Sequence, residues 1–221
     1  MLFYDELQAH TAAERAALLR VPLIQAALRG DIDHGRYVAF LTEAYHHVRH
    51  TVPLLMACGS RLSQRLNWLR AAIAKYIEEE IGHDDWILAD LAACGADADA
   101  IRAGEPRLET SLMVAYAYHQ IDRCNPIGFF GMVHVLEGTS IAIATDAAHA
   151  IRARLGLPAN AFTYLTSHGS LDIEHVKIFE GLMNRVTDAA DQAAIVRCAH
   201  AFYRLYGDIF RALAQDNRRA A

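Results

Sequence analysis

Three polar residues interrupt the apolar stripe of residues 160–186, a segment that otherwise has the periodicity of an amphipathic helix. They are His168, Asp172 and His175, and steps of four and three residues place them above one another on one helix face. The same stripe carries Phe179 and other apolar residues, so it is expected to face a core. Buried ionisable groups need compensation, and a metal ion supplies it because imidazole and carboxylate are natural metal ligands.

Two further predicted helices carry acids or histidine on their apolar stripes. The stripe of residues 63–95 continues through Glu80 and His83, which form a Glu-x-x-His pair. Carboxylate-bridged di-iron bundles project such i, i+3 pairs from their helices. The stripe of residues 126–155 is interrupted once, at Glu137. Three interrupted stripes on separate helices together predict a polar site inside a helical bundle.

A fourth predicted helix, residues 34–58, contributes weaker candidates. Glu43, His47 and His50 lie beside its strongest apolar stripe and could border the core. We take Glu43 as the candidate metal ligand and keep His47 as the alternative. His46 falls on another face and is expected to point toward water.

Charge counting favours iron or manganese at such a site. Two divalent ions bring four positive charges, against three negative charges from Glu80, Glu137 and Asp172. A fourth carboxylate such as Glu43 would neutralise the site, and the histidines would bind as neutral imidazoles. A lone zinc ion would not need so many carboxylates, and calcium would not favour three histidines.

Each feature also has a simpler structural explanation. A single inner acid such as Glu137 is often paired with a cation, and the Glu78-Glu79-Glu80 run is typical of a solvated face. A His-x3-Asp pair can be a hydrogen bond on a helix surface. Their joint occurrence on three apolar stripes favours the metal hypothesis.

Three glycines, Gly128, Gly131 and Gly138, fall within one predicted helix. Each costs about 1 kcal/mol relative to alanine in a helix interior. They indicate either a kinked helix that approaches a ligand or close packing against another helix, and the sequence leaves both open.

The whole chain has a helical pattern. Alternating β-branched residues are absent, and Ala, Leu, Glu and Arg dominate. Breaks coincide with turn or capping residues. The predicted helices are residues 2–19, 21–29, 34–58, 63–95, 108–123, 126–155, 160–186 and 188–216.

Bulk composition excludes several classes of protein. The net charge of −5 and the lack of a long basic run argue against nucleic-acid binding. No segment is typical of a signal peptide or membrane span. Four widely spaced cysteines form no C-x-x-C motif. We therefore expect a soluble protein of a reducing, cytoplasmic compartment, folded as a single domain over residues 1–221.

The order of these motifs resembles a known family. Glu-x-x-His, a later Glu and His-x3-Asp-x2-His, together with the segment VPLIQAALRGDIDHGRYVAFLTEAYHHVRHTVPLL, resemble the haem-oxygenase-like di-iron oxidases, also called iron-containing redox enzymes, over about residues 20–186. The chain is also similar to thiaminase II and pyrroloquinoline-quinone synthase, which share that fold. The resemblance implies an all-α bundle of seven to eight helices around a central cavity.

The resemblance also implies a ligand set and a reaction class. Two irons, or manganese ions, would be held by Glu80, His83, Glu137, His168, Asp172 and His175, with Glu43 as the remaining candidate. Glu137 would bridge the two ions. The implied activity is O2-dependent oxidation of a small carboxylate-bearing or fatty-acid-like substrate, with an external electron donor and a homodimer both compatible. Candidate cavity liners are Phe129, Phe130, Met132 and Tyr164.

Four alternatives remain open. A thiaminase-like hydrolase would need a cysteine nucleophile, for which Cys124 is the candidate. A quinone-forming oxidase of this fold would use a metal-free cavity, and a haem oxygenase would need an N-terminal histidine, here His10. The last alternative is a non-catalytic helical binding protein.

Overall fold

The computed structural model describes the backbone of residues 1–215 and the side chains of residues 1–167 and 176–215. Within that part the chain forms twelve α-helices and three short 3-10 helices, with no strand. The elements are α1 (Phe3–His10), α2 (Ala12–Leu19), α3 (Pro22–Leu28), α4 (His34–Val48), α5 (Thr51–Arg61), η1 (Gln64–Leu66), α6 (Asn67–Glu80), α7 (His83–Ala93), α8 (Ala98–Ala103), α9 (Leu108–Arg123), η2 (Pro126–Phe129), α10 (Phe130–Leu155), η3 (Ala159–Ala161), α11 (Thr163–Met183) and α12 (Ala189–Gln215).

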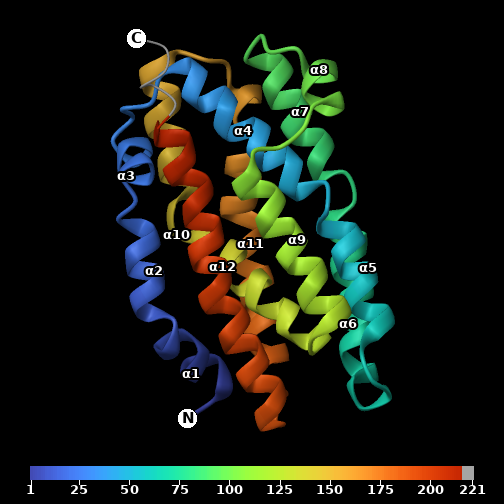
Figure 1. The fold of residues 1–221 in the computed structure, drawn as a ribbon. Coiled ribbons are helices and arrows are strands. Elements are labelled where there is room, and N and C mark those ends of the chain that lie inside the picture. The colour runs from blue at the N-terminus through green and yellow to red at the C-terminus, as the bar shows by residue number, and fades with distance from the viewer. Residues whose placement is uncertain (216–221) are drawn as a thin grey trace.

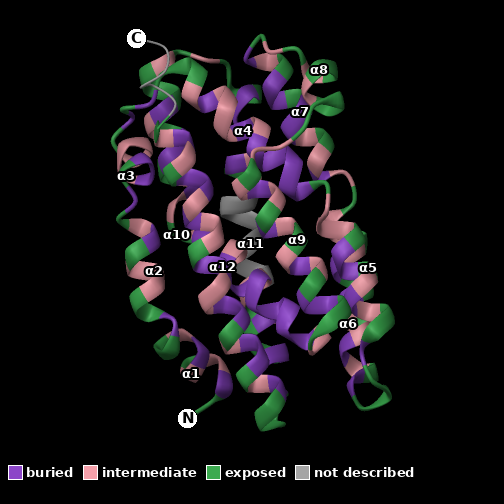
Figure 2. Cartoon of the chain, viewed as in Figure 1, coloured by how far each residue is buried: buried purple, intermediate pink, exposed green. Residues whose placement is uncertain are grey.

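Three long helices form the centre of the bundle. Helix α10 packs against both α11 and α12, and α12 also packs against α9. Helices α2 and α3 flank one side of this centre, while α5 and α6 flank the other (Figure 1). Helix α4 crosses between them and packs against α7, α9 and α12. Buried residues concentrate on the faces that these helices turn toward one another (Figure 2). The all-α bundle predicted from the sequence is confirmed.

The predicted helices are broken more often than expected. Predicted helix 2–19 divides at Thr11 into α1 and α2, and the six-residue helix α8 was not predicted. Predicted helix 34–58 divides between Val48 and Thr51. Pro53 accounts for that break, because proline lacks an N–H and clashes with the carbonyl four residues earlier, yet is tolerated in a first turn.

The most consequential break separates the Glu-x-x-His pair. Glu80 is the last residue of α6 and His83 is the first of α7, so the pair spans a junction instead of lying within one helix. Gly82 makes this junction with φ of 90°, a left-handed conformation that favours glycine. The glutamates that end α6 also oppose the helix dipole, which favours termination there.

Helix α10 is a long apolar helix of the core. Among the described residues, only Pro126–Leu155 is long and apolar enough to cross a membrane by length and composition. However, 56% of its most apolar stretch is buried inside the fold. Burial of that kind is the environment of a core helix.

Two of the three glycines of this region serve close helix packing. A Cβ on Gly131 would lie 2.5 Å from the backbone of Ala199 and Ile195 on α12, and a Cβ on Gly128 would collide with Gln120. A Cβ on Gly138 would meet nothing within 4 Å. Helix packing therefore explains Gly128 and Gly131 and leaves Gly138 without a packing role.

Candidate metal centre

A cavity of about 100 Å³ lies between α4, α5, α6, α10, α11 and α12. We call it the carboxylate cavity, because Glu80 and Glu137 both line it. Its other polar lining residues are His47, Thr51, Tyr76, Ser140, Tyr164 and Tyr206, and its apolar ones are Val48, Leu55, Phe129, Met132, Val133 and Leu136. The structure thus brings together acids from two helices that are far apart in the sequence.

Glu80 and His83 meet at the α6–α7 junction. The Glu80 Oε2 atom lies 3.0 Å from His83 Nδ1, and the exposed fractions of the two side chains are 12% and 4%. The His83 ring lies against the Trp86 ring, with 4.1 Å between their centroids. The turn at Gly82 therefore preserves the acid–imidazole proximity that the Glu-x-x-His motif predicted, by a different route.

His47 supplies an imidazole to the carboxylate cavity. It is buried in α4, and its ring contacts the edge of Tyr206 from α12, with 6.0 Å between centroids. Burial raises the pKa of Tyr206, so that its phenol stays protonated. Both residues line the cavity with Glu80 and Glu137.

Glu43 lies away from this cavity and joins helices instead. Its carboxylate accepts a hydrogen bond of 2.5 Å from the Thr110 hydroxyl and one of 3.2 Å from the Arg107 backbone N–H. The Arg107 Nε atom also lies 3.5 Å from Glu43 Oε1. Glu43 therefore caps the start of α9 and does not reach the wall that carries Glu80 and Glu137. Of the two candidates on α4, the alternative, His47, lines the carboxylate cavity and Glu43 does not.

The side chains of His168, Asp172 and His175 lie outside the described residues. The helix that carries them, α11, packs against α10 and α7. Its start is fixed by Asp90 of α7, whose carboxylate accepts bonds of 3.0 and 2.8 Å from the backbone N–H groups of Thr163 and Tyr164. Burial raises the pKa of Asp90, and these bonds partly offset that effect.

The described donors fit a metal by their chemistry. Two carboxylates and two imidazoles, from Glu80, Glu137, His47 and His83, lie on or beside one cavity, and such mixed sets suit iron or manganese. Among the described side chains, no three histidine, cysteine or acidic groups could by themselves hold an ion. A complete centre would therefore need further donors from outside these described side chains.

Comparison with known families assigns the chain. Residues 38–207 match the model of a family described as iron-containing redox enzymes. The chain belongs to the iron-containing redox enzyme family. No curated protein matches its sequence.

Several solved structures have the same fold as this chain, although their sequences are only 10% to 20% identical to it. A domain of unknown function with a haem-oxygenase-like fold from Shewanella denitrificans is 20% identical with a TM-score of 0.89, and the match covers 97% of this chain and 93% of that one. A TenA homologue from Pseudomonas syringae is 12% identical, at 96% and 93% coverage with a TM-score of 0.79. A haem oxygenase from the cyanobacterium Synechocystis, solved with haem, is 10% identical, at 100% and 96% coverage with a TM-score of 0.78.

The candidate residues for the alternative functions do not line the carboxylate cavity. Cys124 is exposed, with its Sγ atom 3.6 Å from His119 Nε2, and it does not line the carboxylate cavity. His10 is exposed at the end of α1. His46, which was expected to face water, is buried with 2% of its surface exposed, so that expectation was wrong.

The cavity walls contain residues that the sequence did not single out. Tyr76 and Tyr206 line the carboxylate cavity together with Tyr164. Of the other expected liners, Phe129 and Met132 lie on its wall, while Phe130 packs in the core against Phe179. A buried tyrosine on an apolar stripe looks like core in a sequence, so no signal separated Tyr206 from its neighbours.

Proposed function

We propose that this chain is a non-haem di-iron oxidase or oxygenase that uses O2. The observation that carries the proposal is the placement of Glu80, Glu137 and His47 on one cavity, with His83 beside Glu80. Membership of the iron-containing redox enzyme family supports iron as the metal. Manganese is compatible with the same donors.

We assign the remaining ligands to α11. Tyr164 and Phe179 flank the His-x3-Asp-x2-His segment on the same helical stripe. Tyr164 lines the carboxylate cavity and Phe179 lies against the ring of His134 on α10. Both flanking residues therefore lie toward α10, the helix that also carries Glu137, and helical periodicity supports that direction for the proposed ligands between them. The residues that would hold the iron are Glu80, His83, Glu137, His168, Asp172 and His175, with His47 in place of Glu43.

The protein's own residues would prepare the cavity for oxidation. Bound iron would supply the capacity to activate O2 and to remove electrons from a substrate. Leu55, Phe129 and Val133 line the cavity with apolar surface that limits access of water. Tyr206, kept protonated by burial, can donate a hydrogen bond from its hydroxyl to an oxygen atom in the cavity. Trp86 packs on His83 and restricts the orientation of its ring.

The proposed substrate is a small carboxylate-bearing or fatty-acid-like molecule. The carboxylate cavity adjoins a second, mainly apolar cavity, and Ser140, Tyr164 and Tyr206 line both. Space of that kind suits a substrate with a hydrocarbon portion. Reducing equivalents would come from an external donor.

The test applies the same substitution, glutamate to glutamine, at two positions with different surroundings. Glu137→Gln removes a proposed metal ligand, and Glu43→Gln removes the carboxylate that caps α9. We expect Glu137→Gln to lower the number of Fe(II) ions bound per chain by at least one, and Glu43→Gln to leave that number unchanged. Equal iron binding in both variants and the wild type would contradict the proposal and favour a metal-free enzyme of the same fold.

A further inference from the structure

Another cavity, of about 380 Å³, lies between the end of α4, the helix α8 and the first half of α9. We call it the basic cavity, after its polar lining residues, which are His46, Arg49, His50, Arg102, Glu105 and Ser111. Among the described residues, none lines both this cavity and the carboxylate cavity, although His46 and His47 are neighbours in α4. Its volume is within the range of small-molecule sites.

The basic cavity forms where the link between α8 and α9 passes α4 (Figure 1). This link, residues 104–107, is held on α4 by Glu43, whose carboxylate accepts a hydrogen bond of 3.2 Å from the Arg107 backbone N–H. Residues with short side chains, such as Gly104 and Ala115, line the cavity and occupy little of its space. The capping contact of Glu43 therefore also helps to build this cavity.

Arg49 and Arg102 supply the permanent positive charges of the basic cavity. Both are exposed, and neither forms an ion pair within the described part of the chain. The guanidinium carbon of Arg49 lies 5.7 Å from the centroid of the Tyr45 ring, a contact that leaves its N–H donors available. The described lining contains one carboxylate, that of the exposed Glu105. The excess of positive charge favours an anionic ligand.

Two imidazoles add hydrogen-bonding groups to this wall. His46 is buried, and its Nδ1 atom has no hydrogen-bond partner within the described part of the chain. The His50 Nδ1 atom lies 3.3 Å from the Tyr118 hydroxyl. A hydroxyl that donates to Nδ1 places the His50 proton on Nε2, from which it can be donated to a ligand. Because buried polar groups are normally paired, the unpartnered His46 beside a cavity indicates a missing ligand.

The donors of the basic cavity favour a phosphate group over a metal ion or a carboxylate. Among the described residues, no three histidine, cysteine or acidic groups could hold a metal ion, so the imidazoles and the acid of this wall form no metal site. Two guanidiniums, a serine hydroxyl and an imidazole N–H together offer more hydrogen bonds than the two oxygens of a carboxylate accept. A phosphate group has three terminal acceptor oxygens and about two negative charges near pH 7.

We propose that the basic cavity binds the phosphate group of a small phosphate ester through Arg49 and Arg102. Guanidinium groups bind phosphate oxygens through pairs of charge-assisted hydrogen bonds. The Ser111 hydroxyl and the His50 ring line the same cavity and can donate to the remaining oxygen. The site is independent of the proposed metal centre, because neither arginine lines the carboxylate cavity.

The test is an NMR titration of the isotope-labelled, metal-free full chain with inorganic phosphate, glycerol phosphate and acetate at constant ionic strength. Both phosphates should shift the amide signals of residues 102–105 until the site is saturated. Glycerol phosphate should bind more tightly than inorganic phosphate, because the cavity has room for more than the ion. Acetate should bind about tenfold more weakly or less, since it makes fewer charge-assisted bonds.

Substitutions at exposed positions test the site without disturbing the core. Arg49→Gln and Arg102→Gln should each weaken glycerol phosphate binding about tenfold, because each removes a charge-assisted bond. Glu105→Gln should strengthen binding about threefold, because it removes a like charge. The matched control, Arg29→Gln, removes an exposed arginine that pairs with Asp31 outside the cavity, and it should leave binding unchanged.

Several results would overturn the proposal. Shifts that do not saturate, or equal weakening by Arg29→Gln, would show that phosphate responds only to the general charge of the protein. Acetate binding as tight as that of phosphate would exclude a phosphate-specific site, and tighter binding of inorganic phosphate than of glycerol phosphate would exclude an ester. Weaker binding to Glu105→Gln would show that the ligand contacts this acid through a cation. Because the chain is metal-free throughout, each result leaves the proposed metal centre to its own test.

Discussion

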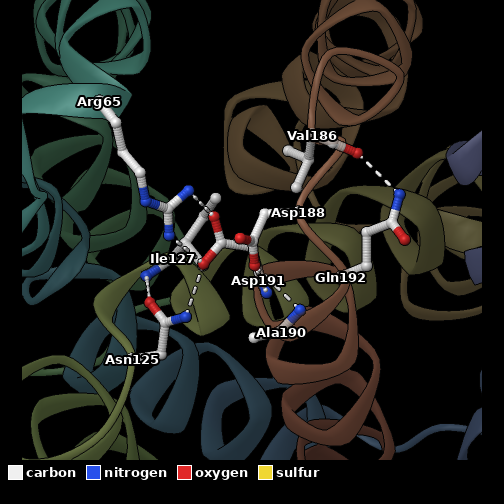
Figure 3. A network of polar contacts seen from close by, with 8 residues as sticks. All are labelled: Arg65, Asn125, Ile127, Val186, Asp188, Ala190, Asp191 and Gln192. Atoms are coloured by element: carbon white, nitrogen blue, oxygen red, sulfur yellow. Dashed lines mark hydrogen bonds and ion pairs between the residues drawn. The ribbon is translucent and has the colours of Figure 1, made fainter.

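Carboxylates inside this bundle occupy two different environments. Asp191, at the start of α12, accepts bonds of 2.5 and 2.8 Å from the Arg65 guanidinium and one of 2.7 Å from the Asn125 amide (Figure 3). Glu80 and Glu137 instead share the wall of a cavity. The hydrogen bonds of Asp191 link η1 and the start of η2 to α12. Glu80 and Glu137 instead place two carboxylates where a ligand can bind.

The pKa of Asp191 shows that its hydrogen bonds compensate for the burial of its carboxylate. Burial alone would raise that pKa, but the bonds from Arg65 and Asn125 outweigh burial and hold it below its usual value. Asp90 and Glu43 are also structural, because each accepts hydrogen bonds from backbone N–H groups at the start of a helix. Such carboxylates should matter for stability, whereas Glu80 and Glu137 should matter for metal binding.

The largest expected effect on stability comes from Asp191→Ala. It removes a fully buried carboxylate that accepts three hydrogen bonds from two side chains, and we expect the free energy of unfolding to fall by about 3 kcal/mol. Urea denaturation measures this change. Fe(II) binding by the folded variant should match the wild type. If Asp191→Ala lost iron binding at unchanged stability, Asp191 would be a metal-binding residue and its assignment as a structural carboxylate would be wrong.

A comparable effect is expected from acid, through a buried histidine outside the cavity. Burial lowers the pKa of His134 to about 4, with a smaller contribution from Arg15, and its Nε2 lies 3.2 Å from the Thr11 hydroxyl. The unfolded chain takes up this proton near pH 6.5 and the folded chain only near pH 4, so stability falls as pH decreases between those values. The loss attributable to His134 is about 3 kcal/mol.

The measurement is the free energy of unfolding from pH 7 to pH 4 for wild type and His134→Gln. The variant cannot titrate at this position, and its stability should decline less over that range. Parallel curves for the two proteins would show that His134 is not the group responsible. Iron binding at pH 7 should be equal in both, because His134 does not line the carboxylate cavity.

The smallest effect on stability is expected at the cavity itself. Glu137→Gln keeps the shape of the side chain and removes a charge that the metal would otherwise balance. We expect the metal-free variant to unfold within about 0.5 kcal/mol of the metal-free wild type, or to be slightly more stable. A loss comparable to that of Asp191→Ala would indicate that Glu137 is structural.

Helical periodicity predicted the bundle and the inner positions of Glu80, His83 and Glu137, because a buried stripe is a property of one helix. It could not separate Glu43 from His47. These residues are one turn apart on α4, but one meets the start of α9 and the other meets α12 at the cavity. Which neighbour a stripe meets depends on packing between helices, and a local pattern does not contain that information.

The breaks between helices show a similar limit. The effect of Pro53 on α4 and α5 could have been read from the sequence, since proline disfavours a helix through the preceding turn. The junction at Gly82 was harder to predict, because isolated glycines such as Gly138 also lie within an unbroken helix.

The most direct test of the central claim is an anaerobic Fe(II) titration of the metal-free wild-type chain, followed by mixing with O2. The account predicts about two ferrous ions bound per chain, and a transient visible absorption that requires both iron and O2. Binding of no iron would contradict it, and the carboxylates of the cavity would then need a structural explanation like that of Asp191.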